Sequence, residues 1–222
     1  LDKPYFGLNV SNMIQVVLEA DRIPLRSGSK PKMCLLRRFP CGCGAVNSCL
    51  RATPELVVQE KDDMSKRVVV YVGAAPLESF SLSGMSSVFS ETGIDKPSVT
   101  VECMGMSEFE SDIRCRSLTM SVSGMSIYKG QVVCEDTATV EASGMSQAVA
   151  DFMCRDLDCT LTGMSVYNGN VIAAESRGRS GWFERMYLSG TARNLMLEVS
   201  GMSQFKGRKF LASGLADCDI SG

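Results

Sequence analysis

Residues 118–126 read Leu118-Thr-Met-Ser-Val-Ser-Gly-Met-Ser126. Before the glycine, apolar Leu, Met and Val alternate with polar Thr and Ser, and a period of two is typical of a half-buried β-strand. The glycine that follows can adopt a positive φ, which a sharp change of chain direction requires. This stretch therefore predicts a strand that ends at a glycine corner.

The same pattern recurs along the chain with a nearly constant period. The intervals between glycines are 21, 19, 20 and 19 residues, and the last interval, 38 residues, is twice 19. A unit of this length cannot bury its apolar face alone, so successive units stack on one another. We predict an all-β, right-handed parallel β-helix (a β-solenoid) with about 20 residues per coil. The tripeptide Gly-Met-Ser begins at Gly84, Gly105, Gly124, Gly144, Gly163 and Gly201.

We expect a single β-helix domain over residues 1–222. Residues 1–75 would form an irregular N-terminal β region or cap, and residues 76–222 would form the regular coils. A β-helix has open edges at both ends, which must be covered or paired. The N-terminal region can cover one end, and we expect the coil that finishes at Gly222 to meet another copy of the chain or a further segment.

Apolar residues also recur ten positions after each glycine, where they would form the opposite wall of the coil. Six of the ten cysteines fall in predicted inward columns, and a free thiol there packs as a small hydrophobic group. The other four match no zinc spacing and favour an irregular loop, with a zinc or disulfide cluster as the alternative. The second column is Ile94, Cys115, Cys134, Cys154, Ala173 and Leu211, and the four other cysteines are Cys34, Cys41, Cys43 and Cys49.

A methionine follows each corner glycine, so six methionines occupy one position of the coil. An outward row would be an exposed apolar stripe, which usually marks an interface, and an inward row would belong to the core. We expect at least partial burial. Stacked thioethers could also bind Cu(I), but we predict no metal site and no cofactor. The row is Met85, Met106, Met125, Met145, Met164 and Met202.

Composition excludes several classes of function. Histidine is absent, which excludes Ser-His-Asp and Cys-His catalysis and histidine-ligated zinc. The chain contains no P-loop and no GxGxxG opening a helix. With 23 basic and 25 acidic residues, nothing points to a nucleic acid partner. No apolar run of eighteen residues predicts a membrane span, and nothing at the N-terminus reads as a signal peptide, so any export signal has been removed or never existed.

The repeat loses its pattern between Gly163 and Gly201. The expected corner glycine is Gly181, but Arg177 and Arg179 precede it where apolar residues are expected, and the single tryptophan, Trp182, follows it. Local violations of a consistent pattern often mark function. Arginine and tryptophan together suit a sugar or a carboxylate, so these three residues are the candidate ligand-binding site. The alternative is a bulged surface loop over which Trp182 packs.

Carboxylates on the predicted polar face leave an enzyme as an alternative. Glu102 and Glu141 would lie two coils apart, at roughly 9.6 Å, near the upper separation for an inverting acid and base pair. Glu141 and Asp158 would lie on adjacent coils. A solvated face on which Ser and Glu alternate explains the same column without chemistry, because alternation avoids stacking like charges. We therefore predict no catalytic residue.

The stretch Val68-Val-Val-Tyr-Val-Gly-Ala-Ala-Pro-Leu-Glu-Ser-Phe-Ser-Leu-Ser-Gly84 and the Ser-Gly-Met-Ser copies after it resemble the head-GIN domain family. These are bacterial cell-envelope proteins described as auto-transporter adhesins, of unknown biochemical function. The opening residues, 4–17, are similar to the family's first strand pair, and the resemblance covers about residues 4–20 and 55–222. The family usually has Ala or Ser where this chain has Met, and residues 25–50 depart from its early strands. It supplies no catalytic motif to transfer.

Together, the repeat and the resemblance imply a non-enzymatic cell-envelope or secreted protein that binds a surface, a glycan or a protein partner. The first alternative is a polysaccharide hydrolase or lyase that acts on the β-helix face. The second is a scaffold that polymerises end to end through its open coil. Ten cysteines are unusual for an exported protein, so a cytoplasmic location stays open.

Overall fold

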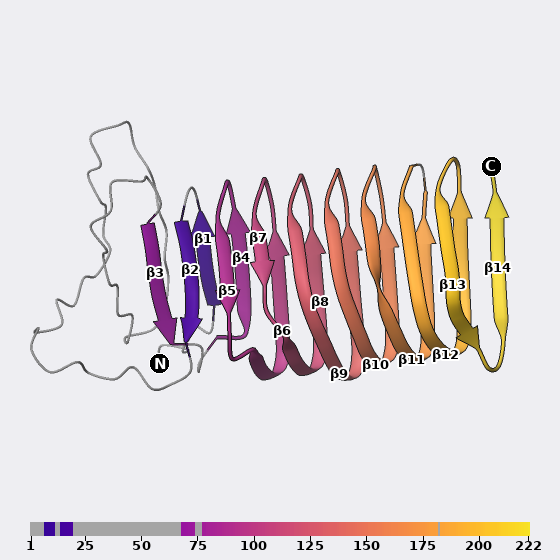
Figure 1. Ribbon diagram of the computed structural model, residues 1–222, viewed down its shortest axis with the longest axis horizontal. Coiled ribbons are helices and arrows are strands. Elements are labelled where there is room, and N and C mark those ends of the chain that lie inside the picture. The colour runs from indigo at the N-terminus through magenta and orange to yellow at the C-terminus, as the bar shows by residue number, and fades with distance from the viewer. Residues whose placement is uncertain (1–6, 12–13, 20–67, 74–76, 182) are drawn as a thin grey trace, which may run out of the picture.

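The computed structural model describes residues 7–11, 14–19, 68–73, 77–181 and 183–222. In this part of the chain all regular secondary structure is β, and no helix is present that could cross a membrane. Coils of about 19 residues stack in about seven turns, with neighbouring strands parallel, as Figure 1 shows along the long axis of the molecule. The predicted parallel β-solenoid is thereby confirmed.

Within the described residues, fourteen strands build the solenoid. One ladder runs in the order β1-β4-β6-β8-β9-β10-β11-β12-β13, and β14 also pairs with β12. This ladder forms one face of the solenoid. The second face begins with strands β3, β2, β5 and β7, paired in that order, and β7 pairs with β9. From β9 to β12, one long strand in each coil runs across both faces. The strands are β1 (Gly7–Ser11), β2 (Ile14–Glu19), β3 (Val68–Gly73), β4 (Ser79–Ser83), β5 (Ser87–Ser90), β6 (Ile94–Cys103), β7 (Glu108–Glu110), β8 (Ile113–Val122), β9 (Ile127–Ala142), β10 (Gln147–Leu161), β11 (Val166–Ser180), β12 (Arg185–Ser200), β13 (Gln204–Ala212) and β14 (Ala216–Ser221).

The N-terminal strands extend the same ladders. β1 pairs in parallel with β4, and β2 pairs in parallel with both β3 and β5. The four cysteines from Cys34 to Cys49 lie outside the described residues, so the loop, zinc and disulfide interpretations of this segment stay predictions. The division of the chain into a cap and regular coils also stays a prediction.

The corner glycines connect the two faces of each coil. Gly124 has a φ of 75°, and a Cβ at this position would lie 2.6 Å from the carbonyl oxygen of Gly105 in the preceding coil. That carbonyl accepts a 2.7 Å hydrogen bond from the backbone N–H of Met125. Only glycine satisfies both the backbone angle and the close stacking of consecutive corners.

The alternating residues before each corner fill the core as predicted. In β8, for example, Leu118, Met120 and Val122 are buried, because the side chains of a strand alternate between its two faces. The same positions are exposed in β14, including Cys218 and Ile220, because no further coil covers this strand. The position of a residue in the repeat thus predicts correctly which side chains point inward. Whether such a side chain is buried depends on a neighbouring coil that covers it.

The predicted second column is correct in its middle and wrong at both ends. Cys115, Cys134 and Cys154 pair directly, and Ala173 follows them. Ile94, however, pairs with Ile113, and Leu211 pairs with Thr191 and is exposed. Counting ten residues from each glycine assumes coils of uniform length. A longer connection before β6 and an irregularity between β12 and β13 change the register there.

Candidate functional site

The two candidate arginines lie on a regular strand. β11 continues to Ser180, and Arg177 and Arg179 point outward while Ser176, Gly178 and Ser180 are buried. A bulged surface loop over residues 175–180 is therefore wrong. The arginines break the predicted apolar pattern because the register is shifted: Ser180 pairs with Leu161, which places Gly181 opposite Thr162 and not opposite a corner glycine. Trp182 lies outside the described residues, so its participation stays a prediction.

A buried carboxylate marks the irregular corner. Glu184 precedes Arg185, which pairs with Val166, so Glu184 occupies the position that serine holds in the other coils. Its Oε2 accepts hydrogen bonds from the Gly181 backbone N–H at 3.1 Å and from the Ser203 hydroxyl at 2.6 Å. Burial of a carboxylate requires such partners. Glu184 was not among the residues predicted from the sequence, although a Glu where every Gly-Met-Ser copy has Ser was a visible departure.

The surroundings of the two arginines differ. Arg179 lies between two carboxylates of neighbouring coils, with Nη1 3.3 Å from Oδ1 of Asp158 and Nε 3.5 Å from Oε2 of Glu198. Arg177 is exposed, and none of the ion pairs found among the described residues involves it. Arg177 is therefore the cation that can turn to an external anion, while Arg179 is held by its neighbours.

A shallow hollow of about 340 Å³ surrounds Arg179. Its lining combines hydroxyl and carboxylate groups with apolar atoms, so it offers a sugar both hydrogen-bond partners and an apolar contact. The hollow does not extend to Glu102 or Glu141. Its polar lining residues include Thr160, Thr162, Ser200, Glu198 and Asp219.

This hollow ends a polar face formed by β4 and the second halves of β6 and of β8 to β12. Two outward columns run along it in register. Glu102 and Glu141 lie two coils apart, and Glu141 and Asp158 lie on adjacent coils, as predicted. One column is Ser79, Thr100, Thr119, Thr139, Asp158 and Arg177, and the other is Ser81, Glu102, Ser121, Glu141, Thr160 and Arg179.

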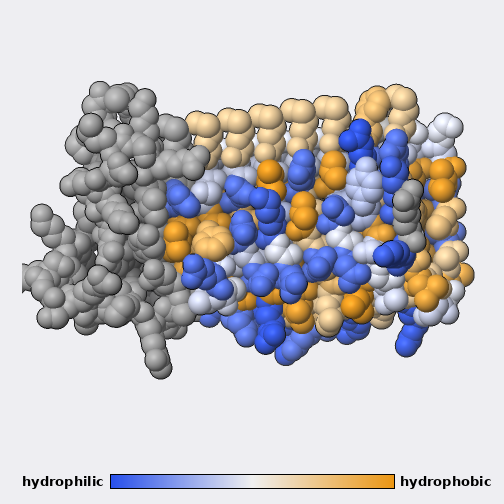
Figure 2. Space-filling model, in the orientation of Figure 1, coloured by the Kyte–Doolittle hydropathy of each residue, from blue (hydrophilic) through white to orange (hydrophobic). Residues whose placement is uncertain are grey.

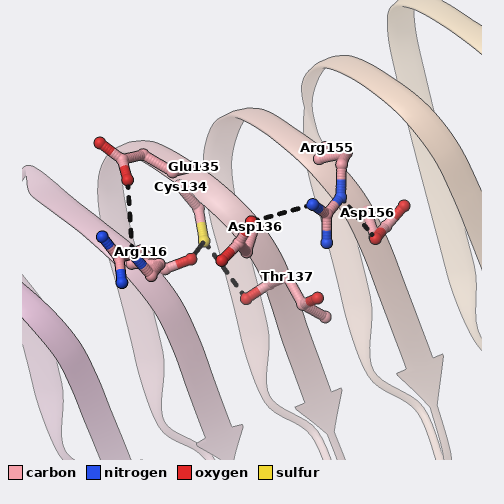
Figure 3. A network of polar contacts seen from close by, with 7 residues as sticks. All are labelled: Arg116, Cys134, Glu135, Asp136, Thr137, Arg155 and Asp156. Atoms are coloured by element: carbon pink, nitrogen blue, oxygen red, sulfur yellow. Dashed lines mark hydrogen bonds and ion pairs between the residues drawn. The ribbon is translucent and has the colours of Figure 1, made fainter.

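The bend between the two faces contains the cysteine ladder, and Figure 3 shows the polar contacts around one member, Cys134. The Cys134 thiol lies 3.1 Å from the Arg116 carbonyl oxygen and 3.2 Å from the Thr137 carbonyl oxygen, and its hydrogen bond is shared between them. The hydrogen bond with Cys134, together with burial, raises the pKa of Cys115. An ion pair of 3.0 Å between Arg155 and Asp136 bridges coils outside the thiol. Among the described residues, no group of three or more His, Cys, Asp or Glu side chains could hold a metal ion.

The thiols give a first testable prediction. All six cysteines that the structure describes are free, and burial raises the pKa of Cys103 and of Cys159 to about 12. Cys218 is exposed on β14. At pH 8 we expect iodoacetamide to modify Cys218 and to spare Cys103 and Cys159, because these two are both protonated and inaccessible. Peptide mass spectrometry measures this, and equal labelling of Cys159 and Cys218 would contradict the packing.

The methionine row lies on the surface, which corrects our expectation of burial. Met85, Met106, Met125, Met145 and Met164 are 49–54 % exposed, and Met202 is 69 % exposed. Outward and inward positions continue to alternate through the corner, so the serine after each methionine points inward. Figure 2 shows the row as evenly spaced apolar residues along the edge where the corner turns lie. By register, Phe183 stands in the row opposite Met164 and is also exposed.

Comparison with known proteins places the chain in a family. The model of a family described as "Putative auto-transporter adhesin, head GIN domain" matches residues 50–181. Searches of curated proteins and of solved structures found no match. The family match covers more than half of the 222 residues and includes the coils that hold both arginines. The chain therefore belongs to the family of auto-transporter adhesin head-GIN domains.

Proposed function

We propose that this protein is a non-enzymatic, adhesin-like binding module of the cell envelope or cell exterior, and that its polar face binds an acidic glycan. The family description supports an adhesin-like role and an extracellular or envelope location. The observation that carries the proposal is the exposed Arg177, which pairs with Asp158 and Met196, continues a column that otherwise carries hydroxyl groups, and lies beside the hollow around Arg179. Trp182 would add an apolar surface for a sugar ring.

The guanidinium of Arg177, at one end of the face, favours a ligand that carries a carboxylate. A guanidinium binds a carboxylate through two parallel hydrogen bonds, and Arg177 has no competing ion pair among the described residues. Ser and Thr hydroxyls can both donate and accept, which matches sugar hydroxyls. Because the face is a sheet with in-register columns, an extended chain can contact several coils at once.

The same geometry favours binding of a polysaccharide without hydrolysis. Glycosidases hold the scissile bond between two carboxyl groups, and exclusion of water strengthens the electrostatic interactions in such a site. Glu102 and Glu141 stand on an open face outside the hollow, and Asp158 is engaged by Arg179. We therefore expect a bound polysaccharide to remain intact.

The test is incubation of the protein with insoluble neutral and carboxylated polysaccharides. Protein retained on the solid and oligosaccharides released into the supernatant are measured, the latter by mass spectrometry. Retention on carboxylated polymers without products supports the proposal. Released products would contradict it and direct mutagenesis to Glu102, Glu141 and Asp158. No retention on any polymer would also contradict it, in favour of a protein partner or self-assembly.

A matched pair of substitutions locates the binding face. Arg177→Ala removes charge-assisted hydrogen bonds, and we expect about tenfold weaker retention or more. Arg114→Ala removes an exposed arginine of β8 that lies outside the polar face and takes part in none of the ion pairs of the described residues. We expect it to leave retention unchanged. Equal losses in both variants would indicate a nonspecific effect of charge.

A further inference from the structure

We propose that the methionine row binds Cu(I), and that the ion is held by thioether sulfurs from three consecutive coils. Thioethers are soft, neutral ligands that select Cu(I) over hard cations. The proposal concerns the edge of the solenoid and is independent of glycan binding on the polar face.

The register of the corners brings the methionines together. The backbone N–H groups of Met106, Met125, Met145 and Met164 each donate a 2.7 Å hydrogen bond to the corner glycine of the preceding coil. Every pair of neighbouring corners is thus one strand spacing apart, or about 4.8 Å. Three sulfurs around one Cu(I), at metal–sulfur distances of about 2.3 Å, would be roughly 4 Å apart. The backbones of the first and third coils of such a set are about 9.6 Å apart, so the two outer side chains must lean toward the middle coil by roughly 3 Å each. Methionine has three rotatable side-chain bonds, which allow its sulfur to move this far.

Packing does not explain the choice of residue. Each of these five methionines is about half exposed, and an exposed position imposes no shape on its side chain. An apolar edge alone would accept Leu, Ile or Val equally well, yet five consecutive coils from Met85 to Met164 carry the same thioether. The second of these coils adds another exposed thioether, Met104, on the other side of Gly105.

The charges beside the row suit a monovalent cation. The residues two positions before and two positions after each of these five methionines are neutral or acidic. In the next coil Phe183 replaces the methionine, and the residue two positions after it is an arginine, Arg185. The uninterrupted thioether row therefore ends where a positive charge appears. The flanking residues are Ser83, Ser87, Met104, Glu108, Ser123, Ile127, Ser143, Gln147, Thr162 and Val166.

The first experiment uses the full chain with ¹³C-labelled methionine methyl groups and silver nitrate in a chloride-free buffer, because Ag(I) is a stable probe for a Cu(I) site. We expect the methyl resonances of the row to shift and to saturate. Those of Met153 and Met196, which are exposed outside the row, should stay in place. Silver bound to a thiol elsewhere would not move the row. A row that does not respond to excess Ag(I) would overturn the proposal.

The second experiment measures Cu(I) affinity by competition with a bathocuproine chelator under anaerobic conditions. Cys34, Cys41, Cys43, Cys49 and Cys218 are replaced by Ser to remove competing thiols. Every set of three consecutive methionines from Met85 to Met164 includes Met125, so Met125→Leu breaks every set. Met104→Leu is added because this neighbouring thioether could replace the missing ligand. The double variant therefore keeps no complete set of three. We expect this variant to bind at least about tenfold more weakly.

The matched control is Met153→Leu with Met196→Leu, which removes two exposed thioethers outside the row. Its affinity for Cu(I) should equal that of the parent. Equal affinity in the row variant and the control variant would overturn the proposal. If the serine background fails to fold, the methyl spectra of the unmodified chain decide the question alone.

Discussion

Gly169→Ala should prevent the solenoid from folding stably. An added Cβ would lie far inside van der Waals contact of the Ala150 carbonyl oxygen and 3.1 Å from the Tyr167 hydroxyl oxygen. That hydroxyl donates a buried 2.9 Å hydrogen bond to the same carbonyl, so neither atom can move without breaking it. We expect a loss of at least about 4 kcal/mol in the free energy of unfolding, measured by urea titration with circular dichroism.

The matched control is Gly181→Ala. Among the described residues, its added Cβ would have only Glu184 Oε1 within contact range, at 4.0 Å, so none of them needs to move. We expect a change within about 0.5 kcal/mol. If the two alanine variants unfold at the same urea concentration, the close approach of the coils at Gly169 is wrong.

The second large effect is expected for Phe152→Ala. Phe152 is 1 % exposed, pairs in register with Val132 and Val171, and its ring centroid lies 6.1 Å from that of Tyr167. Truncation leaves a cavity that the stacked coils cannot close, because their spacing is fixed by the backbone hydrogen bonds. We expect a loss of about 3–5 kcal/mol, again from urea titration.

Phe183→Ala is the same substitution at a 48 % exposed position on the edge of the solenoid. It should change the stability by no more than about 0.5 kcal/mol. Hydrogen exchange provides a second readout. Since each coil contacts only its neighbours, Phe152→Ala should speed exchange most in β9, β10 and β11. Uniform acceleration over all strands would contradict this local interpretation.

Much of the candidate site was visible in the sequence. Arg177 and Arg179 are two residues apart, and in a strand such residues share a face, so their common direction follows from the spacing. That this direction is outward required the structure, because the expected corner at Gly181 placed both at positions of apolar residues. Their different roles could not be predicted in the same way. The ion pairs of Arg179 join residues about one coil away in sequence, Asp158 and Glu198, and they depend on side-chain conformations across two strand boundaries.

The sequence by itself determined the architecture. A period of about 20 residues, with strict alternation before each corner glycine, leaves stacked parallel coils as the arrangement that buries the apolar columns. It also predicted the buried residues of the regular coils, as in Leu118, Met120 and Val122. These features depend on local backbone geometry, which is set by residues close to one another in the sequence.

Only the tertiary structure decided what depends on register between coils. It placed the methionine row outside the core, moved Gly181 away from the corner position and brought Glu184 into the buried serine column. It also separated Ile94 from the cysteine ladder. Two physical reasons apply. Side chains keep alternating through each corner, which turns the methionines outward. Register between coils sets the other three positions: Arg185 pairs with Val166, which puts the corner one residue after Gly181, and Ile94 pairs with Ile113, two residues before Cys115.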